Sequence, residues 1–243
     1  MSLALSIHWN QQYLLSVQFL LDCDPFFNPS MGRPPLNSYE PLFKKVPLQT
    51  HWPQPTTPLR LPKGNRSYCD SETDCYPGWH NCQRKSVLMG SCNPGEMSDN
   101  CPIYFLYDPK IIQSHIYNVG PVTSTITIRP SFFTYSGGIY SSNENESIIG
   151  SLDVTIIGWG QQNSTDNTPS GWWYVIPHLG RDFGASCTEV FGDRYNEVNG
   201  CNSKDKISGI MLIRMGANDS GIESNAVGAI PYNMATEEYE NSN

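Results

Sequence analysis

The sequence lacks any cluster of basic residues. Its 243 residues include 15 Lys and Arg against 23 Asp and Glu, which gives a formal net charge of −8. Because proteins that bind nucleic acid need a concentrated positive surface to hold phosphates, this balance argues against a nucleic-acid partner. Apolar runs of roughly 20 residues, the length that crosses a bilayer as a helix, are also missing, so no membrane span is predicted.

A regular zinc-ligand spacing is missing as well. Cys75, His80 and Cys82 form the nearest candidate group, and their spacing matches no standard zinc finger. We therefore predict no metal and no cofactor, and interpret the cysteines as disulfide-forming. There are eight of them, five within residues 69–101: Cys23, Cys69, Cys75, Cys82, Cys92, Cys101, Cys187 and Cys201. An even number at this density indicates a disulfide framework made in an oxidising compartment.

Possible sites of N-linked glycosylation point to the same compartment. Four Asn-x-Ser/Thr sequons are present, at Asn65, Asn145, Asn163 and Asn218. The first eight residues, however, show neither a basic region nor a small-residue cleavage site. We predict the secretory pathway, an extracellular location or another oxidising lumen. Either Met1 is then not the biological start, or export uses a signal that cannot be recognised here.

Glycine and proline, at 20 and 19 residues, indicate many turns and few long helices. Short helices are predicted within residues 11–24, around 36–45 despite Pro41, and over 109–118, the last with Ile111, Ile112, His115 and Ile116 on one face. β-Branched and aromatic runs predict strands at 122–128, 154–159, 172–176 and 207–215. Residues 1–110 are therefore interpreted as a helical, loop-rich part with disulfide-rich loops at 64–101, and residues 111–243 as a β-rich part.

Four segments, in this order, carry a specific resemblance. They are Leu15-Ser-Val-Gln-Phe-Leu-Leu-Asp-Cys-Asp24, Gly120-Pro-Val122 with Gly138-Ile-Tyr140, Ile156-Ile-Gly-Trp-Gly160, and Ser220-Gly-Ile-Glu-Ser224. Together they resemble the papain family of cysteine proteases, in the form typical of cathepsin B. The resemblance implies a papain-like α+β fold of two lobes, with a truncated N-terminal helical lobe in residues 1–110 and a β-rich lobe in 111–243.

The resemblance also implies where catalytic residues should stand. The family uses a cysteine thiolate, a histidine, an asparagine that orients the imidazole, and a glutamine at the oxyanion. The histidine position is Leu152 and the asparagine position is Pro177. Aligned on the first segment, the cysteine and glutamine positions fall before Met1, so we expect this chain to lack them. Leucine and proline exchange no protons, and the sequence therefore predicts a protein that is not an enzyme.

Three polar residues near these positions receive non-catalytic interpretations. His178 is interpreted as a turn histidine and not a displaced base, because a base needs a nucleophile within hydrogen-bond reach. Asp153 is interpreted as a surface or cleft carboxylate. Asn225 stands where the resemblance places the acidic residue that helps cathepsin B accept basic side chains, so the former specificity pocket should have altered preferences. Cys187 and Cys201 flank a polar loop and are predicted to pair with each other.

Three functions remain open at this point. The favoured hypothesis is an inactive structural or interaction subunit of a larger assembly, with other protein chains covering the surface that the missing N-terminal segment would leave exposed. A second hypothesis is a peptide-binding decoy or regulator with an open cleft. A third is an active or residual cysteine endopeptidase whose start is truncated, which would need a base that Leu152 cannot supply.

Overall fold

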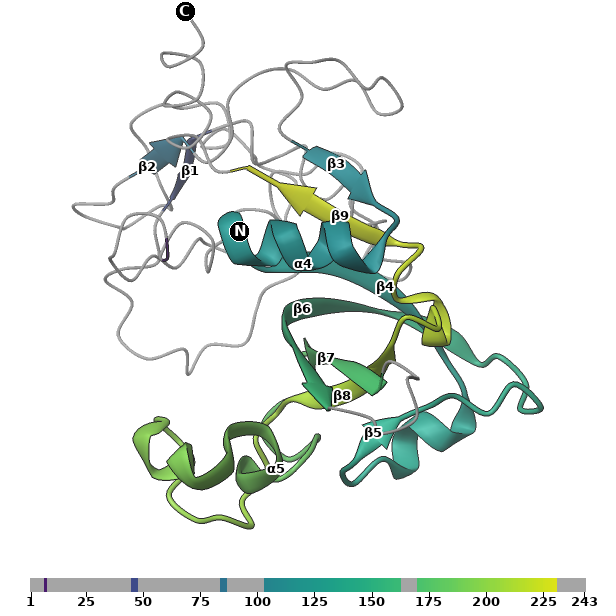
Figure 1. The fold of residues 1–243 in the computed structure, drawn as a ribbon, viewed down its shortest axis with the longest axis vertical. Coiled ribbons are helices and arrows are strands. Elements are labelled where there is room, and N and C mark those ends of the chain that lie inside the picture. The colour runs from purple at the N-terminus through teal and green to yellow at the C-terminus, as the bar shows by residue number, and fades with distance from the viewer. Residues whose placement is uncertain (1–6, 8–44, 48–83, 87–102, 163–169, 231–243) are drawn as a thin grey trace, which may run out of the picture. The chain divides into compact units, whose positions relative to one another are not determined.

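The computed structural model describes residues 7, 45–47, 84–86, 103–162 and 170–230 (Figure 1). The chain divides into two compact units, one formed by Met1–Tyr104 with Ala229–Asn243 and the other by Phe105–Gly228. The helix predicted within residues 11–24 and most of the disulfide-rich stretch at 64–101 lie outside the described residues. The predicted division at residue 110 into two lobes stays a prediction.

In the first unit, two short strands are described. β1 (Lys45–Pro47) pairs antiparallel with β2 (Arg84–Ser86). Lys45 was expected to be the last residue of a helix, and that expectation is wrong at this end. Val46 precedes a proline, and the proline ring disfavours helical backbone in the residue before it, which explains the extended conformation.

A mixed sheet of seven strands, in the order β3-β9-β4-β6-β7-β8-β5, lies in the second unit except for the first two residues of β3 and the last residue of β9. Their bounds are β3 (Ile103–Leu106), β4 (Val122–Ile128), β5 (Ile139–Tyr140), β6 (Gly150–Gln162), β7 (Ser170–Ile176), β8 (Met211–Met215) and β9 (Ala226–Ala229). Neighbours along β4-β6-β7-β8 are antiparallel, and β5 joins β8 in parallel. Figure 1 shows β6 bending as it passes from β4 to β7.

That bend in β6 has a local cause. The strand pairs with β4 over Gly150–Ile156 and with β7 from Thr155 onward, and the register with β7 shifts between Ile156 and Gly158. Such a bulge adds one residue to a strand and increases its twist. One strand of 13 residues can therefore pair with β4 along its first part and with β7 along its second part.

All four predicted β runs are strands, and the one at 122–128 has the predicted bounds, whereas the other three differ. The expected strand at 154–159 extends to 150–162, and the one expected at 207–215 begins only at Met211. Gly209 has a φ of 80°, in the left-handed region, and the Ser208 hydroxyl accepts the Ile210 N–H at 3.1 Å. The chain therefore bends at Gly209, after an isolated bridge at Ile207, and β8 starts only beyond this bend.

Helix α4 (Pro109–Asn118) begins where the sequence predicts. The Asp108 side chain accepts the Lys110 N–H at 2.7 Å, and Pro109 occupies the first turn, where its missing N–H costs nothing. Ile112 and His115 are buried, as expected. Ile111 was expected on the same face but is 54% exposed, because adjacent helical residues point about 100° apart.

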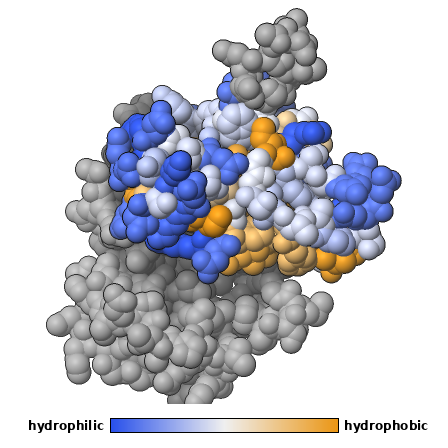
Figure 2. Space-filling view, turned by 90° about the horizontal axis from the view of Figure 1, so that it is seen from below, coloured by the Kyte–Doolittle hydropathy of each residue, from blue (hydrophilic) through white to orange (hydrophobic). Residues whose placement is uncertain are grey.

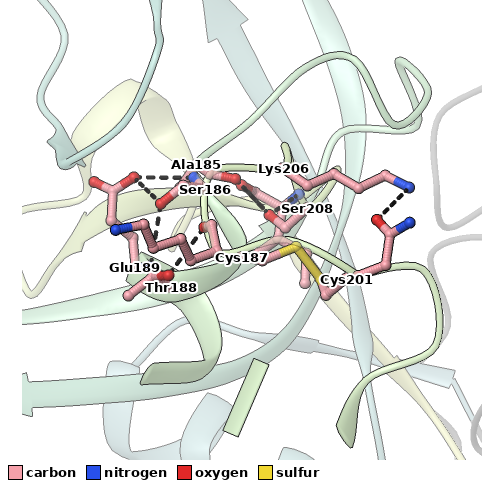
Figure 3. Close-up of a disulfide and its surroundings, with 11 residues drawn as sticks. Ala185, Ser186, Cys187, Thr188, Glu189, Cys201, Lys206 and Ser208 are labelled. Carbon is pink, nitrogen blue, oxygen red and sulfur yellow. Dashed lines mark hydrogen bonds between the residues drawn. A yellow bond between two sulfur atoms is a disulfide. The ribbon is translucent and has the colours of Figure 1, made fainter. Parts of the chain in front are cut away.

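A disulfide-closed segment lies between β7 and β8. It contains α5 (Cys187–Phe191) and the 3₁₀ helix η4 (Gly192–Glu197), and the predicted Cys187–Cys201 bond closes it, with a Cα–Cα distance of 5.8 Å (Figure 3). Ser186 and Glu189 form a reciprocal capping box at the start of α5. Among the described residues, the other 3₁₀ helices are η3 (Pro130–Thr134) and η5 (Asp219–Gly221).

Candidate functional site

Leu152 lies near the start of β6, directly opposite Ile126 of β4. Burial alternates along this part of the strand: Val154 is buried like Ile126, whereas Asp153 is exposed. Side chains two residues apart share a face of a sheet, so the half-buried Leu152 belongs to the face that packs into the core. At this position the chain presents an isobutyl group, which packs but cannot hold or move a proton.

Pro177 lies beside the same end of the β6–β7 pair. It directly follows Ile176, the last residue of β7, which is opposite Thr155 of β6. Pro177 is buried and has no N–H, so it cannot donate a further hydrogen bond to the ladder. The structure therefore brings the two sequence-predicted positions, Leu152 and Pro177, to the same end of two neighbouring strands. Neither offers a polar side-chain atom.

His178 follows Pro177 in an unusual conformation. Its φ is 57°, in the left-handed region that residues other than glycine rarely adopt. Its ring Nε2 lies 2.9 Å from the Thr155 hydroxyl. Thr155 is an odd number of residues from Leu152 on β6 and so projects from the opposite face. Burial lowers the pKa of His178, which favours the neutral ring at neutral pH.

Asp153 and Asn225 are brought together by a residue that sequence reasoning missed. Thr125 of β4 is opposite Asp153, and its hydroxyl donates to the Asp153 carboxylate at 2.7 Å. The Asn225 amide donates to the Thr125 carbonyl at 3.4 Å and to the Gly221 carbonyl at 3.1 Å. The alternating threonines of the run Thr-Ser-Thr-Ile-Thr were the available signal. The result is an exposed polar group, defined by Thr125, Asp153 and Asn225, that can accept a donor from a ligand.

Glu223 is a second residue that the sequence did not single out. Its buried carboxylate accepts the indole N–H of Trp173 at 2.9 Å. The same carboxylate accepts the backbone N–H of Gly216 at 2.6 Å and that of Asn218 at 2.7 Å. A buried carboxylate is tolerated when donors satisfy it in this way. Glu223 therefore fixes the turn after β8 to β7, and its role is structural.

The described residues bear on the metal and membrane predictions. Within them, no group of three or more His, Cys, Asp or Glu could hold a metal ion. No helix in that part of the chain is both long and apolar enough to span a bilayer. Cys75, His80 and Cys82 lie outside the described residues, as do Cys23, Cys69, Cys92 and Cys101, so the absence of zinc stays a prediction.

Comparison with known proteins decides the family. The model of the papain family cysteine proteases matches residues 1–211. This chain belongs to the papain family. The cathepsin B-like character is confirmed by relatives such as "Cathepsin B-like cysteine proteinase 3" of Caenorhabditis elegans, 29% identical over 119 residues, which are 49% of this chain and 25% of that protein. "Cathepsin B-like protease 1" of Arabidopsis thaliana is 27% identical over 124 residues, 51% of this chain and 26% of that protein.

Solved structures of the papain family confirm the fold. "proCathepsin B S9 from Trypanosoma congolense" superposes with a TM-score of 0.59 at 16% identity, covering 93% of this chain and 63% of that one. "Structure of digestive procathepsin L 3 of Tenebrio molitor larval midgut" gives a TM-score of 0.57 at 16% identity, with 93% and 59% covered. The predicted papain-like α+β fold is therefore correct. The matched stretch spans only about a quarter of the length of these curated relatives.

Proposed function

We propose that this papain-family chain is catalytically inactive and acts as a structural or interaction subunit of a larger assembly. One observation carries the proposal: Leu152, which the resemblance places at the family's histidine position, lies on the core-facing side of β6, opposite Ile126. A thiol protease needs an imidazole to form and hold its thiolate. Pro177, at the asparagine position, could not orient such a ring even if one were present.

The two described histidines do not supply a substitute. His178 is held by the Thr155 hydroxyl on the opposite face of β6 from Leu152. His115 is buried in α4, where burial lowers its pKa to about 4. A Cβ added to Gly228 would lie only 2.8 Å from the His115 ring, so this imidazole is packed tightly against β9. In this proposal, the His115 ring contributes to packing against β9, and the His178 ring contributes to the turn after β7.

An inactive family member should keep its scaffold for binding, and two features support this. Several large apolar side chains are exposed in the second unit, including Phe133 at 65%, Ile148 at 64% and Ile149 at 54%. Figure 2 shows hydrophobic residues gathered along one edge of the described surface, beside a mainly hydrophilic region. Exposed apolar patches of this kind mark interaction sites on soluble proteins. We propose that another protein chain covers this patch.

We also propose that the protein works in the secretory pathway or another oxidising lumen. The Cys187–Cys201 bond supports this location, because disulfides persist mainly in oxidising compartments. An acidic, disulfide-bonded scaffold with exposed apolar side chains fits a subunit that is assembled and retained in such a compartment.

The decisive experiment is reaction with an epoxide that alkylates papain-type thiolates. Intact mass of the purified full chain should show no adduct, and a fluorogenic peptide should not be hydrolysed. An active papain-family enzyme treated in parallel serves as the positive control. An adduct on one cysteine together with peptide hydrolysis would establish the alternative, a residual endopeptidase, and overturn the proposal.

A peptide-binding decoy is the second candidate, and the exposed group of Thr125, Asp153 and Asn225 favours it. A peptide-library pull-down with the wild-type chain and an Asp153→Ala variant distinguishes it from the subunit. Enrichment of peptides that depends on Asp153 would support the decoy.

Native mass spectrometry tests the assembly directly, and a stable monomer in extracts of cells that make the protein would count against the subunit.

A further inference from the structure

Two of the four sequons lie among the described residues, and they are chemically matched. Asn145-Glu-Ser147 and Asn218-Asp-Ser220 both have an acidic middle residue and a serine. The motif alone therefore gives the same expectation for both. Differences between them must come from the folded structure.

Asn145 is presented outward by a tight turn in the segment between β5 and β6. The Glu146 N–H donates to the Asn143 carbonyl at 3.0 Å, and the Asn145 N–H donates to the Asn143 side chain at 3.1 Å. Asn145 and the Ser147 that completes its sequon are both exposed. The backbone of the turn is thus satisfied locally, and the Asn145 amide projects into solvent without serving the turn.

The turn that carries Asn145 is also fixed to the rest of the unit. The Glu146 carboxylate accepts the Ser131 N–H of η3 at 2.8 Å. The Arg129 guanidinium donates to the Glu146 carbonyl. Figure 1 shows the segment between β5 and β6 at the periphery of the sheet. A group attached to Asn145 would extend away from the fold without displacing any of these contacts.

Asn218 is also exposed, but its side chain, unlike that of Asn145, builds the turn that surrounds Glu223. Its Oδ1 accepts the backbone N–H groups of Glu223 and Ser224, both at 3.0 Å. Its Nδ2, the atom that a sugar would occupy, donates to the Ser224 hydroxyl at 3.3 Å. Asn218 adopts a φ of 48°, and Ser220 of its sequon is only 9% exposed. A glycan would replace one hydrogen of Nδ2 and leave Oδ1 in place, so the crowding would arise at Nδ2, beside the Ser224 hydroxyl.

We infer that Asn145 is an N-glycosylation site of this protein and that Asn218 is not. In the transfer, a bond forms between Asn145 Nδ2 and C1 of the sugar. The bond between that C1 and the pyrophosphate oxygen of a lipid-linked oligosaccharide donor breaks, the lipid pyrophosphate leaves, and the amide gives up one proton to a base of the transferase. The inference depends on the proposed secretory location, since the donor and transferase act there.

The test is site-resolved glycopeptide mapping of the full chain exported from a eukaryotic host behind a cleavable signal. The peptide containing Asn145 should carry glycan in most molecules, and the peptide containing Asn218 should be unmodified. Ser147→Ala should remove the Asn145 glycan while keeping the asparagine. Ser220→Ala, the matched control, should leave the glycan content unchanged and keep the Asn218 contacts.

An exported chain with unmodified Asn145, or one with glycan at Asn218, would overturn the inference. Either result would leave the proposed loss of peptidase activity untouched, because the epoxide reaction tests that separately. Mapping individual peptides also separates these two sites from Asn65 and Asn163, which lie outside the described residues.

Discussion

Glu223 illustrates how one side chain can organise a turn. Its carboxylate accepts three N–H groups, from Trp173, Gly216 and Asn218. Glu223→Gln would place an amide NH₂ opposite at least one of these donors and remove the charge from the remaining bonds. We expect the free energy of unfolding to fall by about 2–4 kcal/mol, measured by urea denaturation at neutral pH.

A surface carboxylate provides the matched control for Glu223. Glu197 pairs with Arg194 at 2.7 Å, but both side chains are exposed. Glu197→Gln should change the unfolding free energy by no more than about 1 kcal/mol. Equal losses for the two glutamine variants would show that burial of Glu223 does not contribute in the way we describe.

His115 predicts a pH dependence of stability. Burial lowers its folded-state pKa from 6.5 to about 4, so between these values the unfolded chain binds more protons than the folded one. Stability should therefore be intact above pH 6.5 and fall as the pH drops toward 4. The full loss from this group is about 3 kcal/mol, measured as the difference in unfolding free energy between neutral and acidic buffer.

A variant isolates the contribution of His115 from that of other groups. The pKa of His178 is also lowered by burial, so it acts in the same direction. His115→Leu keeps an apolar group against Gly228 and removes one titration. The pH dependence of the variant should be shallower than that of the wild type. Parallel curves would exclude His115 as a source of the acid sensitivity.

At the scale of an element, the segment closed by Cys187–Cys201 should unfold locally when its disulfide is lost. The two cysteines are 14 residues apart, and a loop of this size corresponds to about 3 kcal/mol of stabilisation. Replacing both cysteines by serine should cost up to that amount. Amide hydrogen exchange should become faster mainly within residues 187–206.

Backbone hydrogen bonds where the segment joins β7 and β8 should confine the local unfolding to the segment. Ala185 N–H donates to Ile210 O at 2.7 Å, and Cys187 N–H donates to Lys206 O at 2.7 Å. These bonds do not depend on the sulfur atoms, so exchange in β7 and β8 should remain slow. Faster exchange throughout the sheet would mean that the disulfide stabilises the whole unit instead.

At the scale of the whole molecule, the proposed assembly makes the exposed apolar side chains testable. Ile148→Ser with Ile149→Ser should change the unfolding free energy by less than about 1 kcal/mol, because both side chains are largely exposed. If a partner covers them, the native mass should shift from the complex toward the single chain. Tyr117→Ser, an exposed position on α4, is the control and should leave the complex intact.

Much of the second unit could be predicted from local sequence. The β-branched and aromatic runs of β4 and β7 encode strands in their own composition, and Asp108-Pro109 marks the start of α4. The site was harder to predict, because its contacts join distant residues. Thr125 meets Asp153 across 28 positions and Asn225 across 100, and no local pattern encodes such pairings.

The bulge in β6 separates two parts of the strand that have different neighbours in the sheet. The first half, with Leu152 and Asp153, pairs with β4, whereas Gly158 and the residues after it pair only with β7. A substitution before Thr155, as at Leu152, therefore faces β4 alone in the sheet and leaves the register with β7 unchanged. A papain-family sheet divided in this way can change side-chain chemistry at one end of a strand and still keep its strand pairing at the other.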